Sequence, residues 1–93
     1  MKIRVGLFSL LRLRFGIPSL EIETERAVSM KELIDLAAAK IGNELTEQLL
    51  TGGAIRKGTL LLVDGRNVLL MEGLATMVDE HNEISFFPPS GGG

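Results

Sequence analysis

The last three residues of the sequence, Gly91, Gly92 and Gly93, have the most distinctive chemistry in the chain. Glycine has no Cβ, so a run of glycines can extend into a narrow channel and adopt backbone angles that strain other residues. A free α-carboxyl group has a pKa of about 3.3–3.7, so at neutral pH it is ionised and becomes electrophilic only after activation. We therefore expect Gly93 to be a reactive group that another enzyme activates. The ordinary alternative is a flexible terminus without a role.

The residues before the glycines indicate how such a tail would be held. Pro88 and Pro89 each fix φ near about −65° and lack a backbone donor, so they end any strand that arrives through Phe87. We expect the two prolines to hold a flexible tail of residues 90–93 away from the body of a folded domain formed by residues 1–89.

Composition restricts the chemistry that the chain can perform alone. Its 93 residues suffice for one domain, and a net charge of −2 gives no basic field for nucleic acid. There is no cysteine to act as a thiol nucleophile or metal ligand, and the single histidine, His81, has no partner for a catalytic dyad. We expect no metal, no bound cofactor and no active site within the chain.

Hydropathy and the start of the sequence bear on its location. The sequence has no apolar run of about 18 residues, the length of a membrane span, and it begins with a strand pattern instead of a signal peptide. We expect a cytoplasmic protein without a membrane partner.

The first half of the chain predicts a hairpin. Residues 2–8 and 20–25 alternate apolar and polar side chains, which is the pattern of half-buried strands, and the two segments should pair. The segment 9–16 between them has no clean period and ends at Gly16, so it is expected to be a connecting loop that can hold a short helical turn.

A helix should follow this hairpin. Ser29 and Glu32 have the spacing of a capping box, and apolar residues then recur at helical intervals up to Ile41. This pattern predicts a helix over residues 30–41 that packs on the sheet. Asn43 is expected to cap a second short helix that ends near Leu50.

The second half of the chain predicts another hairpin and a last strand. Asp64-Gly65 separates the apolar runs 59–63 and 67–70, which is a strong hairpin signal. The run from Leu60 to Val63, which includes Leu62, does not alternate, so either both of its faces are covered or one face meets a partner.

Residues 84–87 should form the last strand. If Ile84 and Phe86 point into the core, Phe87 points outward, and Phe8 shares that outer face. The alternative for Phe8 and Phe87 is packing beneath the segment 9–16.

These elements predict an α+β fold in which a mixed sheet of four or five strands is covered on one face by one main helix. A parallel pairing of the first and last strands would bring the basic first quarter of the chain beside its acidic last quarter. This arrangement is the layout of the β-grasp, or ubiquitin-like, fold.

Three segments of the chain carry a resemblance to a known family. They are Phe8 to Arg12 with Gly16, the hairpin Leu62-Val63-Asp64-Gly65, and the ending Phe87-Pro88-Pro89 with Gly92-Gly93 two residues later. With these segments the chain resembles, over its full length, the ubiquitin-like sulfur carriers of the MoaD and ThiS type, most closely the small subunits of molybdopterin synthase. It differs from their usual pattern at Ser90-Gly91 and at Glu80-His81-Asn82.

The resemblance implies a mechanism in which other proteins supply the catalytic groups. In such carriers a ubiquitin-activating-type adenylyltransferase uses ATP to adenylate the terminal glycine, here Gly93, and sulfur then replaces AMP to give a thiocarboxylate. Gly91 and Gly92 would provide reach. The large subunit of molybdopterin synthase would then use the sulfur. The residues expected to contact these partners are Phe8, Phe87, Pro88, Pro89, Leu60 and Leu62.

Three other functions remain open at this point. The same acyl-adenylate can react with an amine, so the chain could be a protein modifier that forms isopeptide bonds through Gly93. It could carry sulfur for thiamine synthesis or tRNA thiolation. It could also be a binding domain with an incidental glycine tail.

Overall fold

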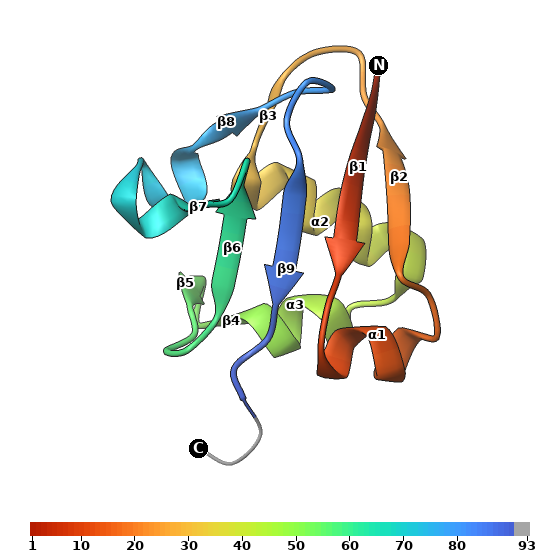
Figure 1. Cartoon of the computed structure of the whole chain (residues 1–93), viewed down its shortest axis with the longest axis vertical. Helices are drawn as coiled ribbons and strands as arrows, with labels where there is room; N and C mark the ends of the chain where they lie inside the picture. Colours follow the sequence, from red (N-terminus) through yellow and green to blue (C-terminus); the bar gives the residue numbers. More distant parts are fainter. Residues whose placement is uncertain (91–93) are drawn as a thin grey trace.

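The computed structural model describes residues 1–90, and Figure 1 shows how their helices and strands are arranged. A five-stranded sheet has the order β2-β1-β9-β6-β7. Its strands are β1 (Lys2–Leu7), β2 (Ser19–Glu23), β6 (Leu60–Val63), β7 (Arg66–Asn67) and β9 (Ile84–Phe87). The last strand in the sequence, β9, lies in the middle of the sheet, parallel to β1 and antiparallel to β6.

The longest helix, α2, lies across one face of this sheet (Figure 1). The mixed sheet and its one main helix confirm the predicted α+β fold and β-grasp layout. The helices are α1 (Leu10–Phe15), α2 (Met30–Ile41) and α3 (Glu44–Leu49), with the 3-10 turns η1 (Val68–Leu70) and η2 (Gly73–Ala75). Two small ladders pair β3 (Val28–Ser29) with β8 (Met77–Val78) and β4 (Leu50–Thr51) with β5 (Ala54–Ile55).

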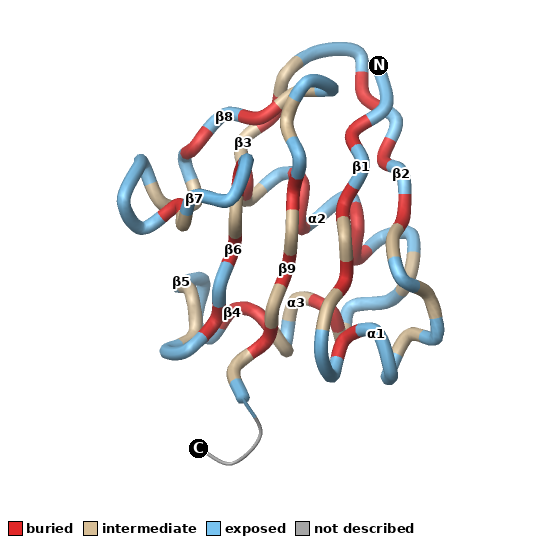
Figure 2. Tube along the Cα trace, in the orientation of Figure 1, coloured by how far each residue is buried: buried red, intermediate tan, exposed pale blue. Residues whose placement is uncertain are grey.

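The hydrophobic core fills the space between the sheet and α2, as the buried positions in Figure 2 show. Each long strand contributes every second residue, so the predicted alternation in residues 2–8 and 84–87 is confirmed. The fully or almost fully buried side chains include Ile3, Val5, Leu7, Met30, Leu33, Ile34, Ala37, Ile84 and Phe86. Within residues 1–90, no helix combines the length and the apolar composition needed to cross a membrane.

Helix α2 has the predicted bounds because both of its ends carry stop signals. The Ser29 hydroxyl accepts a hydrogen bond from the Glu32 backbone N–H at 3.1 Å. At the other end, Gly42 has a φ of 122° and donates its N–H to Ala38. The Glu32 carboxylate lies 3.9 Å from the Arg26 guanidinium. Of the two hydrogen bonds in the predicted capping box, the described residues therefore form only the one accepted by Ser29.

The structure agrees with one prediction about a short segment and corrects another. The helical turn that segment 9–16 was expected to hold is the six-residue helix α1, which Gly16 ends in the left-handed conformation. Asn43 precedes α3 as expected, but its own backbone is helical, with φ −63° and ψ −17°, and its side chain makes no capping bond. The helix predicted there exists without the predicted cap.

The strand predicted over residues 67–70 is also wrong. Pairing with β6 ends at Asn67, and the 3-10 turn η1 follows. The side-chain oxygen of Asn67 accepts the backbone N–H of Leu69 at 2.9 Å. In a longer strand the Leu69 N–H would be available for pairing with a neighbouring strand. The bond to Asn67 satisfies this donor locally and so competes with strand pairing.

The predicted hairpin turn at Asp64-Gly65 is confirmed. The φ angles of 53° and 82° are the positive values that a tight two-residue hairpin turn requires. The Asp64 carboxylate accepts hydrogen bonds from the Glu83 backbone N–H at 2.7 Å and from the Asn82 side chain at 2.8 Å. The turn is thereby joined to the residues that precede β9.

The packing of α2 can be tested with Leu33→Ala. Leu33 is fully buried, so its truncation should lower the free energy of unfolding by about 2–5 kcal/mol. Leu36 lies on the same helix and is 40% exposed, so Leu36→Ala is the matched control and should cost less than about 1 kcal/mol. Urea unfolding measures both. Equal costs would show that α2 does not pack through the face containing Leu33.

The Asp64 interactions predict a pH dependence. The hydrogen bond from the Glu83 backbone, followed by that from Asn82, lowers the pKa of the Asp64 carboxyl below its ordinary value. Its contribution to stability is therefore full above the ordinary aspartate pKa of about 3.9 and is lost as the pH falls through the lower pKa of the folded state. Asp64→Ala should destabilise the domain near neutral pH, and its difference from wild type should shrink in strong acid. A difference that is constant with pH would contradict this assignment.

Candidate functional site

The sheet face opposite α2 carries a short row of apolar side chains. Strand register places Leu60 of β6 opposite Phe87 of β9, and Phe8 follows β1 on the other side of Phe87. Leu60 is 41% exposed, and the two phenylalanines are half-buried. Three of the residues predicted to contact a partner therefore lie together. Leu62, also half-buried, lies two residue pairs further along the ladder, opposite Ser85.

The two phenylalanines form a stacked pair. The ring centroids of Phe8 and Phe87 are 4.7 Å apart with an angle of 12° between the planes. The Arg12 guanidinium lies 4.8 Å from the centroid of the Phe8 ring, and its Nε donates a hydrogen bond to the Leu7 carbonyl at 2.9 Å. A cation over an aromatic ring at an exposed site contributes about 0.5–1 kcal/mol. Arg12 thus helps to fix the orientation of Phe8.

The turn after β1 places Arg12 beside Phe8. Ser9 has a φ of 56° and a ψ of −133°, a conformation that is rare outside glycine and costs about 1–3 kcal/mol. The Leu11 and Arg12 backbone N–H groups then donate to the carbonyls of Phe8 and Ser9. The alternative prediction, in which Phe8 packs beneath the segment 9–16, is correct in part. Arg12 belongs to that segment, and its guanidinium lies over the Phe8 ring.

Gly6 is a residue of this surface whose role was not predicted. A Cβ at Gly6 would lie 2.7 Å from Cε2 and 3.1 Å from Cζ of Phe8, closer than van der Waals contact allows. The Phe8 ring can therefore lie over β1 only because residue 6 has no side chain. A glycine inside an alternating strand pattern is the signal that could have indicated such a close approach.

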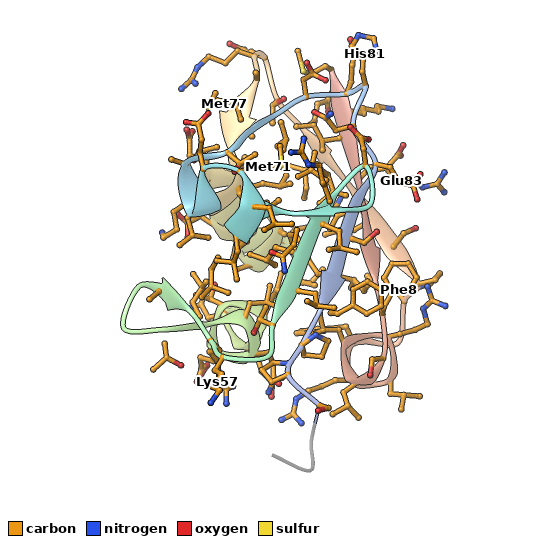
Figure 3. All side chains as sticks on the ribbon, turned by 60° about the vertical axis from the view of Figure 1, so that its left-hand side comes forward. Phe8, Lys57, Met71, Met77, His81 and Glu83 are labelled. Carbon is orange, nitrogen blue, oxygen red and sulfur yellow. The ribbon has the colours of Figure 1, made fainter. Side chains whose placement is uncertain are left out.

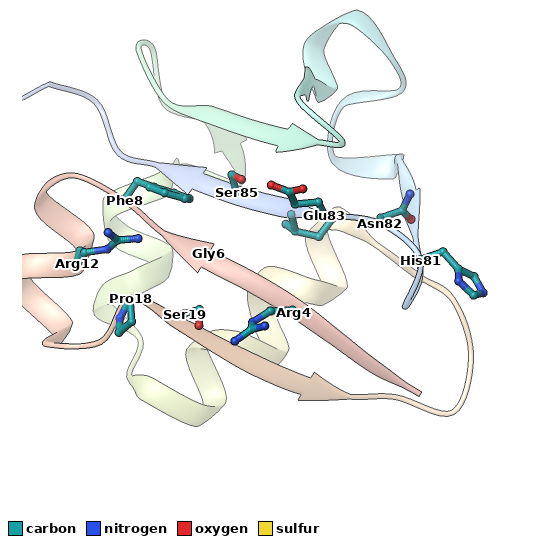
Figure 4. A pocket seen from close by; sticks show the side chains of 11 residues that line it. Arg4, Gly6, Phe8, Arg12, Pro18, Ser19, His81, Asn82, Glu83 and Ser85 are labelled. Atoms are coloured by element: carbon teal, nitrogen blue, oxygen red, sulfur yellow. The ribbon is translucent and has the colours of Figure 1, made fainter.

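A hollow of about 640 Å³ lies beside the Phe8 ring on the same face of the sheet. Figure 4 shows Phe8 and Arg12 at one end of this hollow and Glu83, Asn82 and His81 toward the other. Its floor includes Gly6. The stacked aromatic pair therefore adjoins a hollow whose lining combines apolar atoms with charged side chains such as Arg4 and Glu83.

The two prolines after β9 differ in exposure. Pro88 is buried, so little of its ring is accessible and the structure does not support the prediction that it contacts a partner. Pro89 is half-buried, and its Cβ would be 3.5 Å from a Cβ built on Gly58. The two prolines follow the end of β9 as expected, and both lie against the domain. Ser90 is exposed. Gly91, Gly92 and Gly93 lie outside the described residues.

Within residues 1–90, no three His, Cys, Asp or Glu side chains are grouped closely enough to hold a metal ion.

Comparison with known proteins gives the family. Residues 5–93 match the ThiS family. The chain belongs to the ThiS family. This membership confirms the resemblance drawn from residues 8–16, 62–65 and 87–93. The matched region includes both the aromatic pair and the glycine ending.

Three similar proteins illustrate this relationship. A protein of Archaeoglobus fulgidus that is named as a sulfur carrier is 35% identical over 74 residues, which are 80% of this chain and 83% of that protein. The solution structure of the HVO 2177 protein of Haloferax volcanii has a TM-score of 0.81 at 25% identity and covers 100% of this chain and 87% of that one. Small archaeal modifier protein 1 of Methanosarcina acetivorans has a TM-score of 0.79 at 25% identity, over 99% and 96% of the two chains.

The contact between Gly6 and Phe8 predicts the effect of Gly6→Ala. The new methyl group should displace the Phe8 ring from Phe87, which NMR would detect as changed ring-current shifts of both rings. Because the half-buried ring can move toward solvent, the cost in stability should stay below about 1 kcal/mol. Ser85→Ala, at the position opposite Gly6 on β9, is the control and should leave the rings in place. In a Phe8→Ala background the cost of Gly6→Ala should largely disappear. Unchanged ring shifts in Gly6→Ala would refute the contact.

Proposed function

We propose that this chain is a sulfur carrier whose Gly93 is adenylated and converted to a thiocarboxylate, and that it supplies this sulfur as the small subunit of molybdopterin synthase. Membership of the ThiS family supports the carrier role. The proposal depends chiefly on the outward-facing stack of Phe8 on Phe87. Phe87 precedes Ser90, the residue before the three glycines, by three positions. The Phe-Pro-Pro ending favours the molybdopterin branch.

The proposed chemistry takes place at the Gly93 carboxylate. One of its oxygens attacks the α-phosphorus of ATP held by an adenylyltransferase, and pyrophosphate leaves. A sulfur nucleophile at the oxidation level of sulfide then attacks the carbonyl carbon, so a C–S bond forms and the C–O bond to AMP breaks. The chain contains no cysteine that could hold sulfur as a persulfide. Gly93 is accordingly the attachment point.

The short tail requires the activating enzyme to dock on the domain itself. Three residues span at most about 10 Å even when fully extended, so Gly93 cannot reach an active site unless the enzyme approaches Ser90 closely. The stacked pair and Leu60 provide the nearest exposed apolar surface of the sheet. In this proposal these three residues contact the enzyme, Gly6 and Arg12 hold Phe8 in position, and Pro88 anchors the tail.

A second function is favoured by one comparison. The small archaeal modifier protein 1 of Methanosarcina acetivorans shares the fold over nearly the full length of both chains. If lysine amines replace sulfur as the nucleophile toward the Gly93 adenylate, the product is an isopeptide bond. The docking surface and the adenylation step are the same in both functions, so the two differ only in what reaches the activated carbonyl.

Changes at the glycine ending test the proposal. Deletion of Gly93, or Gly92→Val, should abolish adenylation by the cognate adenylyltransferase, because a displacement of about 1 Å at the reacting atom can cost on the order of 100-fold in rate. Ser90→Ala, further from the carboxylate, is the matched control and should be adenylated normally. Urea unfolding of all three variants should match wild type.

Mass spectrometry of the native chain then distinguishes the two functions. A carrier should contain a fraction of molecules heavier by the difference between sulfur and oxygen, and fragmentation should place that mass at Gly93 and not at a methionine. Sulfur transfer that survives deletion of Gly93 would refute the carrier function. Gly93 joined to lysines of other proteins, without any thiocarboxylate, would establish the modifier function instead.

A further inference from the structure

Basic residues gather at the end of the domain where Ser90 lies. Helices α1 and α3 and the segment 54–58 surround this end, and they carry four of the ten basic residues of the chain but only two of its twelve acidic residues. The basic residues are Arg12, Arg14, Arg56 and Lys57, and the acidic residues are Glu44 and Glu47. This end therefore has an excess of two positive charges, although the whole chain has a net charge of −2.

The base of the tail lies in a groove between these elements. The groove has a volume of about 580 Å³, and Arg56, Lys57 and Gly58 line it together with Pro89 and Ser90. Its remaining lining includes Leu10 of α1. A protein that receives the residues after Ser90 must pass over this lining, so the charges along the groove face that protein directly.

The positive charges at the groove differ in how far they are already neutralised. Arg14 forms an ion pair with Glu44, which raises the pKa of the arginine and lowers that of the carboxyl, chiefly through the hydrogen bond between them. Arg56 donates to the Glu47 backbone carbonyl at 3.1 Å, and no carboxylate among residues 1–90 pairs with its charge. Within residues 1–90 the Lys57 ammonium makes neither an ion pair nor a hydrogen bond, and the residue is exposed. Arg56 and Lys57 thus keep their charge available.

The opposite end of the domain has the reverse balance. The hairpin turn and the loop before β9 contain Asp64, Asp79, Glu80 and Glu83 against Arg66. Figure 3 shows Lys57 near the tail end of the domain and His81, within that acidic loop, at the other end. The charges of these side chains therefore form a dipole along the sheet, whose positive end surrounds the base of the tail that carries the Gly93 carboxylate.

We propose that Arg56 and Lys57 form a basic rim that docks on an acidic rim around the channel of the adenylyltransferase that receives Gly93, with Leu10 and Leu13 of α1 as the apolar part of the same contact. This inference rests on the proposed function. Leu13 is 79% exposed and Leu10 is 45% exposed, and such apolar side chains beside cations suit a protein surface better than a nucleic acid backbone. The acidic far end of the domain would further disfavour nucleic acid.

The dipole gives the rim a particular effect. Complementary charges accelerate encounter and orient the two proteins, and they change the association rate more than the chemical step. An acidic channel attracts the basic end of the dipole and repels its acidic end. Both interactions favour an approach in which the tail faces the channel. The rim should therefore act on kcat/KM at low salt and have little influence on kcat.

Charge reversal at one residue from each end tests this proposal. Lys57→Glu should lower kcat/KM for adenylation by about 10-fold at low salt, and the loss should shrink when physiological salt reduces the Debye length to about 8 Å. Arg66→Glu makes the same change in net charge at the far end and should stay within about twofold of wild type. Adenylation at saturating carrier should be unchanged in both variants.

The outcomes separate the rim from the proposed function. Equal losses for Lys57→Glu and Arg66→Glu, or no loss for either, would overturn the rim while leaving the carrier function intact. A wild-type chain that is not adenylated at all would overturn both. Replacement of an acidic residue beside the enzyme's channel by lysine should restore the Lys57→Glu variant, and failure of every such replacement would also count against the rim.

Discussion

The structure depends above all on the pairing of β9 between β1 and β6. The two neighbours hold the backbone of this strand from both sides, so the directions of its side chains are fixed. Phe86 is directed into the core, and Phe87 is directed outward onto Phe8. The hydrophobic core and the stacked pair on the outer face therefore share one strand. A substitution that loosened the core at Phe86 would also disturb the aromatic pair on the other face.

The elements predicted correctly are those determined by local sequence. The helix over residues 30–41 follows from its apolar period with Ser29 and Gly42 at its ends, and the Asp64-Gly65 turn follows from its need for positive φ. The η1 turn could not be predicted with the same rules, because one side-chain bond from Asn67 competes with strand pairing. Apolar residues alone favoured the strand.

The candidate site was predictable in part for the same reason. Alternation in the last strand indicated that Phe87 faces outward, and the structure confirms its contact with Phe8. The burial of Pro88 and the packing of the Phe8 ring over Gly6 depend on how the chain folds in three dimensions. The basic groove is of this second kind, since Arg56 and Lys57 come from a different part of the sequence than Leu10. No single window of the sequence contains it.

The central place of β9 also determines when during protein synthesis the domain can form. Every other strand precedes β9 in the sequence, so a growing chain on the ribosome has β1 and β6 but nothing to place between them. Closing this non-local pairing is a slow class of folding step. Until Phe87 is available, Phe8 has no aromatic partner. The stacked pair on the outer face of the sheet therefore forms only after almost all of the described chain has been made.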